Sequence, residues 1–243
     1  MKKSKTKTAL FDQKKMILSD KSPFTVKEAY KTLRTNVMFS LPGNDSKCIG
    51  VVSADRGDGK SSVAINLAIS FSQIKKKVIV VDCDLRLPTI ATKLGIDSKY
   101  GLSNFLSGNQ DSDESLIRYS KTFGIDIVTS GEIPPDPTTL LESNQMKSFI
   151  ELMKKHYDYI ILDFPPVNIV SDAAIMSEIV DGYLIVVRHN ESEYHKISET
   201  LRQMQFAGAK ILGFVYNGKD DRKKYYKSTK YNKYYYHNKY YYK

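Results

Sequence analysis

A short glycine-containing segment carries the clearest chemical signal in the sequence. Residues 54–61 read Ala-Asp-Arg-Gly-Asp-Gly-Lys-Ser and directly follow a β-branched run at 48–53. This arrangement fits a phosphate-binding loop between a strand and a helix, with Ala54 in place of the first glycine. We therefore expect ATP to bind here. The loop residues predicted to contact it are Asp55, Arg56, Gly57, Asp58, Gly59, Lys60, Ser61 and Ser62.

The residue types in this loop suit phosphate chemistry. Gly57 and Gly59 let the backbone curve so that its N–H groups point at phosphate oxygens, and the start of the following helix adds positive potential. Lys60 can bridge the β- and γ-phosphates, and the Ser61 hydroxyl can ligate Mg²⁺. An ordinary glycine-rich turn is the alternative, but it needs neither the lysine nor the serine. A dinucleotide fingerprint is excluded, because Ser62 stands where its third glycine should be.

Three carboxylates are expected to face this loop. Asp82 and Asp84 lie on one side of an extended chain at the end of the run "VIVVDCD", and Asp163 ends the run "YIILD". Such acids can hold Mg²⁺ directly or through water, and one can accept the proton of an attacking hydroxyl. A solvated strand end capped by Arg86 is the alternative for Asp82 and Asp84 alone. We predict catalytic roles for Lys60, Asp82 and Asp84, magnesium contacts from Ser61, Asp82 and Asp163, and nucleotide contacts from Arg86 and Asn217.

The pattern of the chain predicts one α/β domain with a doubly wound, mostly parallel sheet of the P-loop NTPase type. Nearly continuous apolar runs indicate strands covered on both faces, and they alternate with stretches of helical spacing. The expected strands are 48–53, 77–82, 125–130, 159–164, 182–188 and 210–216. The expected helices are 25–39, 61–74, 144–156, 171–179 and 193–207, and a short helix at 102–106 lies in a loop-rich insertion at 95–122.

Charge and composition divide the 243-residue chain into three parts: a basic segment (1–24), the domain (25–218) and a tail (219–243). The net charge is +10, but residues 222–243 contain eight Lys or Arg and no acid, which leaves +2 for the rest. No apolar run is long enough to span a bilayer and no signal peptide is evident, so we expect a cytoplasmic protein. Cys48 and Cys83 should then be buried reduced thiols.

The tail combines lysines with nine tyrosines and has no aliphatic residue that could form a core, so we expect it to be disordered. Lysine and tyrosine together also suit a nucleic-acid-binding tail, through phosphate contacts and base stacking. That alternative would rank first without the phosphate loop. With the loop present, we expect no nucleic-acid partner.

These motifs together resemble the bacterial tyrosine kinases that accompany capsule and exopolysaccharide synthesis, in the form where the cytosolic kinase is a separate chain. The resemblance covers nearly the whole sequence. "KEAYKTLRTN" (27–36) is similar to the opening helix of that family. The segments "SADRGDGKSS", "VIVVDCDLRLP" and "YDYIILDFPP" are similar to its three nucleotide motifs, and the tail to its tyrosine cluster.

The resemblance implies ATP- and Mg²⁺-dependent phosphorylation of the tail, between neighbouring subunits of a ring. It also implies activation by a transmembrane partner of the polysaccharide co-polymerase type, recruitment to the inner face of the membrane through that partner, and reversal by a phosphatase. The subunit contacts of the family fall on Glu28, Lys31 and Arg34, where Lys31 replaces an arginine and lacks its bidentate fork. The implied phosphate acceptors are Tyr225, Tyr226, Tyr231, Tyr234, Tyr235, Tyr236, Tyr240, Tyr241 and Tyr242.

A second function stays open at this point, namely a partition or positioning ATPase of the same superfamily that hydrolyses ATP to change partners. Such proteins usually carry a lysine as the second loop residue, and Asp55 stands there. A third is a nucleic-acid-binding module with a vestigial nucleotide loop. For Asn217, a turn residue before Gly218 is as reasonable as an adenine contact.

Overall fold

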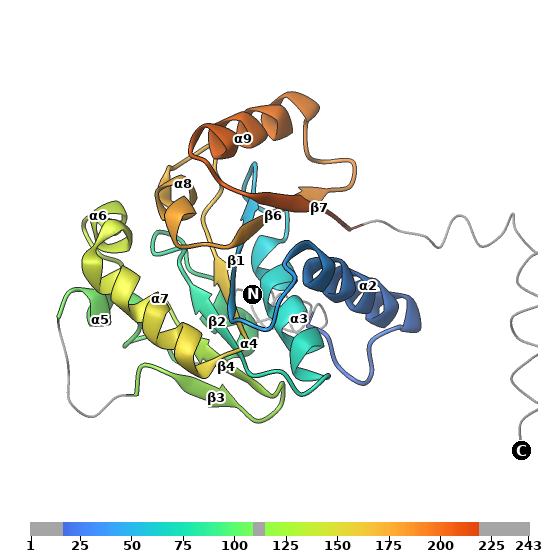
Figure 1. Ribbon diagram of the computed structural model, residues 1–243, viewed down its shortest axis with the longest axis horizontal. Helices are drawn as coiled ribbons and strands as arrows, with labels where there is room; N and C mark the ends of the chain where they lie inside the picture. The colour runs from blue at the N-terminus through green and yellow to red at the C-terminus, as the bar shows by residue number, and fades with distance from the viewer. Residues whose placement is uncertain (1–16, 109–114, 219–243) are drawn as a thin grey trace, which may run out of the picture.

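The computed structural model describes residues 17–108 and 115–218. Residues 1–16, most of the predicted basic segment, and the whole tyrosine-rich tail lie outside the described part. The elements follow one another in a βα pattern (Figure 1). They are α2 (Phe24–Ser40), β1 (Lys47–Ser53), α3 (Lys60–Ser72), β2 (Val78–Asp82), α4 (Ile90–Leu94), α5 (Leu102–Leu106), β3 (Arg118–Ser120), β4 (Ile125–Val128), α6 (Pro137–Glu142), α7 (Asn144–His156), β5 (Tyr159–Asp163), α8 (Asp172–Ile175), a 3₁₀ turn η1 (Met176–Glu178), β6 (Gly182–Arg188), α9 (Tyr194–Phe206) and β7 (Ile211–Asn217).

The strands form one seven-stranded sheet within the described residues, in the order β3-β4-β2-β5-β1-β6-β7. Every pairing is parallel except that of β3 with β4. The central strands β1, β2 and β5 are almost fully buried, as expected for runs covered on both faces. The order places β1 between β5 and β6, so the chain reverses its winding direction beside β1. This is where such folds bind ligands.

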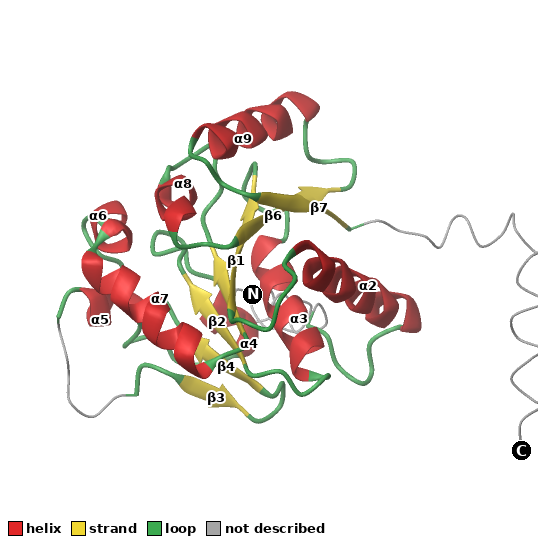
Figure 2. Cartoon of the chain, viewed as in Figure 1, coloured by secondary structure: helices red, strands yellow, loops and turns green. Residues whose placement is uncertain are grey.

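Helices cover both faces of the sheet (Figure 2). One core cluster joins α2 and α3 to residues of β1, β2 and β5, with Phe71 stacked on Tyr159 at a centroid distance of 3.7 Å. A second cluster, on the opposite face, joins α7 and the α8 region to the same strands. Cys48 and Cys83 lie in this second cluster as buried free thiols, as predicted.

The predicted helix at 171–179 is the main difference from the sequence expectation. It divides into the single turn α8 and the tighter turn η1. The Ala173 carbonyl, which would accept a helical hydrogen bond, instead accepts one from the Tyr183 hydroxyl at 2.7 Å. Three short elements were not predicted at all: α4, β3 and α6.

Candidate nucleotide-binding and active site

The phosphate loop connects β1 directly to α3, as predicted. Gly57 and Gly59 have φ values of +89° and +95°, a region that residues with a Cβ rarely adopt. A Cβ at position 59 would lie 2.1 Å from Asn217 Nδ2, so any other residue here must displace this side chain. The loop leads into the buried start of α3, which has no side-chain cap, so its first N–H groups can bind an anion.

A hydrogen-bond network fixes the shape of this loop from neighbouring elements. Asp58 accepts from the Asp55 N–H at 3.2 Å and from the Ser192 hydroxyl at 2.9 Å. Asn217, at the end of β7, donates from Nδ2 to the Asp58 carbonyl at 2.8 Å. Arg188, at the end of β6, donates from Nη1 to the Gly57 carbonyl at 2.5 Å. Burial raises the pKa of Asp58, against the lowering effect of these donors.

Arg188 and Ser192 were not predicted as loop contacts. Neither belongs to a sequence motif, and only the pairing of β6 with β1 brings them beside the loop. Asn217 was predicted near the nucleotide, and it does lie against the loop. Its position is a consequence of β7 ending next to β6 at the same edge of the sheet.

The predicted lysine and carboxylates converge at this edge. Lys60 Nζ lies 2.9 Å from Asp84 Oδ2 and 3.7 Å from Asp163 Oδ1. Asp82 pairs in register with Asp163 on the adjacent strand, and its two oxygens accept the N–H groups of Asp84 and Ile90, each at 3.2 Å. The loop, β2 and β5 therefore bring one cation and three acids to a single buried point.

Burial dominates the electrostatics of these acids. It raises the pKa of Asp82 well above the ordinary value, and the charge of Asp163 adds to the effect. Burial likewise raises the pKa of Asp163, although the charge of Lys60 opposes it. Lys93 on α4 is a cation that the sequence analysis missed: burial lowers its pKa, while Asp163 acts in the opposite direction.

The residues at this point fit Mg²⁺. Both oxygens of Asp163 are buried with no close hydrogen bond within residues 17–108 and 115–218, and only the Lys60 ammonium at 3.7 Å and the nearby Ser61 hydroxyl face them, which leaves room for a ligand to complete the site. Ser61 Oγ, which accepts a 2.8 Å hydrogen bond from the Thr89 hydroxyl, keeps a second lone pair for a metal. No group of three or more His, Cys, Asp or Glu in these residues forms a ready metal cage. This agrees with Mg²⁺, which takes few protein ligands and completes its shell with phosphates and water.

The Arg86 side chain is bound by residues outside the phosphate loop. Its guanidinium donates from Nε and Nη2 to Asp172 at 3.1 and 3.3 Å, and from Nη2 to the Thr138 hydroxyl at 2.8 Å. Thr138 in turn donates to Asp172 at 2.9 Å. The side chain predicted to contact nucleotide thus links the segment after β2 to α6 and α8.

The three predicted subunit-contact residues lie on α2. Lys31 Nζ pairs with Glu28 Oε1 at 2.7 Å, one turn away on the same exposed helix surface. Arg34 donates from Nη1 to the Ser70 carbonyl near the end of α3. Arg34 therefore contributes to the packing of α2 on α3, while Glu28 and Lys31 stay accessible.

Comparison with known proteins places this site in a family. The family described as "ParA: NUBPL iron-transfer P-loop NTPase" matches residues 44–231. The chain is 36% identical over 192 residues to tyrosine-protein kinase YwqD of Bacillus subtilis, covering 79% of this chain and 81% of that protein. The chain belongs to the bacterial tyrosine kinase family.

Solved structures agree with this assignment. The kinase domain of the Escherichia coli tyrosine kinase ETK superposes with a TM-score of 0.77 at 31% identity, covering 81% of this chain and 76% of that one. The chimerical protein CapA2B2 gives a TM-score of 0.74 at 31% identity, covering 81% and 85%. Within the part of this tyrosine kinase that the structure describes, no helix has the length and apolarity to cross a membrane.

Asp55 separates this tyrosine kinase from the partition-ATPase alternative. Its carboxylate forms an ion pair with Lys196 on α9 at 2.9 Å, and Lys196 also pairs with Glu193 at 3.2 Å. A carboxylate tied to the protein's own helix cannot supply the cation that partition ATPases usually carry at this loop position. The predicted phosphate-accepting tyrosines lie outside the described residues.

Proposed function

We propose that this chain transfers the γ-phosphoryl group of ATP to tyrosines of its own C-terminal cluster. The observation that carries the proposal is the convergence of Lys60 with Asp82, Asp84 and Asp163 beside the phosphate loop, in a member of the tyrosine kinase family. By this modification the kinase regulates capsular or exopolysaccharide synthesis.

The residues divide the work as follows. The N–H groups of the loop and of the first turn of α3 bind the β- and γ-phosphates, and Lys60 neutralises their charge. Ser61, Asp82 and Asp163 hold Mg²⁺, which when bound shields the phosphates and orients them. Arg188, Ser192 and Asn217 fix the shape of the loop through the network around Asp58. Phosphoryl transfer needs mostly such positioning and charge stabilisation.

In the transfer step the phenol oxygen of the tyrosine bonds to the γ-phosphorus as the bond to the bridging β–γ oxygen breaks, and ADP leaves. The phenol proton passes to Asp82. A tyrosine of ordinary pKa near 10 is only about 0.1% ionised at pH 7, so a neighbouring base accelerates the step by roughly 10²- to 10⁴-fold.

Assembly and localisation complete the proposal. Glu28 and Lys31 are exposed on α2, where another subunit can replace their mutual ion pair. A ring built on this surface would bring the tail of one subunit to the site of the next. A transmembrane activator recruits the kinase to the inner face of the cell membrane, and a tyrosine phosphatase reverses the reaction. The likeness to the CapA2B2 chimera supports a second, separate component.

The decisive experiment incubates the purified full chain with Mg-ATP, with and without the cytoplasmic end of its activator, and maps modified residues by mass spectrometry. We expect phosphate on residues 225–242 in the wild type and none in Lys60→Met. Exposed Lys99→Met serves as the matched control and should retain activity. Release of ADP with no phosphotyrosine in the presence of the activator would favour the partition-type ATPase instead.

A further inference from the structure

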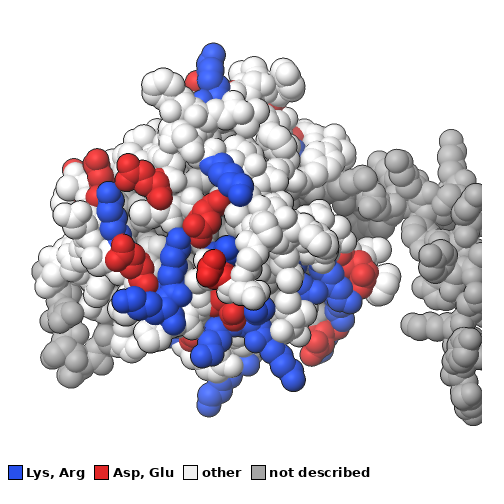
Figure 3. All heavy atoms as spheres, viewed as in Figure 1, with Lys and Arg blue, Asp and Glu red and all other residues white. Residues whose placement is uncertain are grey.

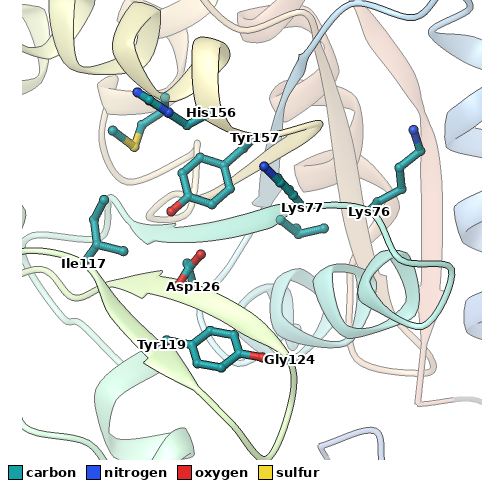
Figure 4. Close-up of a pocket in the computed structure, with 10 residues that line it drawn as sticks. Lys76, Lys77, Ile117, Tyr119, Gly124, Asp126, His156 and Tyr157 are labelled. Atoms are coloured by element: carbon teal, nitrogen blue, oxygen red, sulfur yellow. The ribbon is translucent and has the colours of Figure 1, made fainter.

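A pocket of about 460 Å³ opens at the edge of the sheet opposite the phosphate loop (Figure 4). It lies where β2, β4 and β5 begin, whereas the active site lies where parallel strands of the same sheet end. Its volume is in the range of small-molecule sites. The lining residues that matter for its chemistry are Lys76, Lys77, Tyr119, Asp126, His156 and Tyr157.

Two basic side chains of this pocket are uncommitted. Lys77 and His156 are both exposed, and neither side chain makes a hydrogen bond or ion pair to another residue of the described segments. The backbone of Lys77 is nevertheless fixed, because its N–H donates to Asp158 Oδ2 at 2.8 Å and its carbonyl accepts from the Asp158 N–H at 2.9 Å. The pocket therefore presents donors on a rigid frame.

The acids in and beside the pocket already have donors. Asp158 receives Lys76 Nζ at 3.2 Å in addition to the Lys77 N–H. Asp126 accepts the hydroxyl of Tyr157, which points toward it in Figure 4. On the face shown in Figure 3, basic and acidic side chains lie interspersed. The two lysines and two aspartates balance formally, so what the pocket offers an anion is the uncommitted donors of Lys77 and His156.

Aromatic rings form part of the wall. Tyr119 on β3 is 62% exposed, and Tyr157 lies across from it (Figure 4). Ile117 and Met153 add apolar surface to the lining. Rings and apolar surface suit an aromatic group, and the free donors suit an anion attached to that group.

We propose that this pocket binds a phosphotyrosine of the C-terminal cluster, from the same chain or from a neighbouring copy. The aryl ring packs between Tyr119 and Tyr157, and the phosphate accepts hydrogen bonds from Lys77 and His156. The inference rests on the proposed function, because the active site makes the ligand. The pocket then retains the product far from the site of transfer, which leaves the active site free for the next tyrosine.

The chain is long enough for this connection. The described part ends at Gly218 beside the phosphate loop, and β7 lies four strand positions from β2. Four strand spacings amount to roughly 19 Å, and the length of a strand adds about 17–23 Å. Residues 219–242 span up to roughly 80 Å when extended. Even with a detour around the domain, the cluster can reach the pocket of its own chain.

Binding is tested with the phosphatase-treated full chain in the absence of ATP. A synthetic peptide of residues 229–243 with phosphotyrosine at position 235 is titrated calorimetrically, beside the same peptide unmodified, phenyl phosphate and inorganic phosphate. We expect the phosphopeptide to bind at least about tenfold more tightly than the unmodified peptide. Phenyl phosphate should compete with it, and inorganic phosphate should compete much less, because it lacks the ring.

Two charge-reversal variants locate the site. Lys77→Glu should weaken phosphopeptide binding about tenfold or more, while Lys155→Glu should change it less than about threefold. Lys155 is exposed on the last turn of α7 at the same edge but does not line the pocket, so it controls for general basicity. Tyr157→Phe provides a further variant that keeps the ring and removes only the hydroxyl bound to Asp126, and it should bind within about threefold of the wild type.

Several results would overturn the inference. Equal affinity for both peptides would exclude a phosphate-reading site, and equal losses in the two lysine variants would indicate a diffuse basic surface. Binding to vesicles of phosphatidylglycerol and phosphatidylcholine without phosphopeptide binding would assign this edge to the membrane. Because the peptides are synthetic, failure here leaves the kinase activity untouched, and absence of kinase activity would not prevent the peptide from binding.

Discussion

Lys60 and Asp84 form a buried ion pair, with 2.9 Å between Nζ and Oδ2 and only 10% and 6% of the two side chains exposed. Burial alone lowers the pKa of Lys60, but the charges of Asp163 and Asp84 outweigh burial and raise it. The lysine proposed to bind phosphate is therefore held by carboxylates, and ATP must compete with them for its ammonium group.

This competition predicts opposite effects of Asp84→Asn on binding and on chemistry. With one competing charge removed, Lys60 is more available, so the affinity for Mg-ATP should stay equal or rise by about threefold. The rate of tyrosine phosphorylation should fall by about 10²-fold or more, because a catalytic carboxylate is lost. Fluorescent-nucleotide titration and single-turnover phosphorylation measure the two effects. An unchanged rate would remove Asp84 from the catalytic group.

A pH-dependent stability difference is expected for Asp163→Asn in the nucleotide-free, magnesium-free protein. The folded-state pKa of Asp163 is raised above the unfolded value of about 3.9, so the folded protein binds this proton more tightly than the unfolded chain. Stability of the wild type is therefore lost as pH rises from about 4 through the folded pKa, and regained as pH falls. At pH 7 the melting temperature of Asp163→Asn should be roughly 2–4 °C above that of the wild type. This corresponds to about 1 kcal/mol in the free energy of unfolding.

The same difference should narrow as the pH falls toward 4 and close below it, because the carboxyl group is then protonated in the unfolded state as well. Thermal unfolding between pH 4 and pH 8 checks this. Magnesium and ATP should stabilise the wild type but not the variant, since Asp163 is proposed to hold the metal. A difference in melting temperature between wild type and Asp163→Asn that stays constant with pH would show that the buried charge is not its cause.

Arg86→Ala should destabilise the protein through Asp172, which is fully buried and would lose its cation. Because the Arg86 side chain is 36% exposed, we expect a loss of about 2 kcal/mol in the free energy of unfolding, below that for a fully buried pair. Adding Asp172→Asn should restore part of it, because Thr138 can still donate to the amide oxygen. If Arg86 contacts nucleotide, ATP affinity should fall in both the single variant and the double variant. Recovery of ATP affinity in the double variant would mean that Arg86 has only a structural role.

Lys31→Arg should increase self-association. Guanidinium can form a bidentate pair with a carboxylate of a neighbouring subunit, and the ammonium of Lys31 cannot. Sedimentation of the variant should show a larger fraction of ring-sized species than the wild type at equal concentration. Lys27→Arg on the same helix makes the same chemical change outside the predicted contact and should leave the distribution unchanged. Equal effects of both variants would assign the change to arginine content alone.

The elements that could be predicted from sequence are those whose causes are local. β6 and α7 were predicted with the bounds that the structure shows, β6 from its continuous apolar run and α7 from its helical spacing. The loop and its facing acids were predicted because the strand ends of a parallel sheet must meet. The helix α6 was missed although Asp136 caps it and Pro137 begins it, because its six residues are too few to show a helical period.

The missed contacts depend on tertiary neighbours. Arg188 and Ser192 have ordinary sequence contexts, and they reach the loop only because β6 pairs with β1. The sequence also could not show that Arg86 would bind Asp172, which lies 86 positions away and is fully buried. Such partners follow from the packing of α6 and α8 and have no periodic signal.

Gly59 supplies a direct test of the loop geometry. Gly59→Ala places a Cβ where the backbone has φ +95°, and the new carbon would meet Asn217 Nδ2 at 2.1 Å. The variant should lose about 1–2 kcal/mol from backbone strain. It should also lose at least about tenfold in ATP affinity, because moving Asn217 breaks its hydrogen bond to the Asp58 carbonyl.

Gly208→Ala is the matched control. It has a similar φ of +71° but no atom within 4 Å of the added carbon, so it should show the strain without the loss of ATP affinity. The double variant Gly59→Ala/Asn217→Ala removes the steric conflict but keeps the backbone strain at position 59, so it should stay destabilised, and its ATP affinity should stay low because the loop has lost its anchor. Calorimetric titration with ATP and thermal unfolding measure both quantities. Equal ATP affinities for the two single variants would mean that Asn217 does not hold the loop for nucleotide.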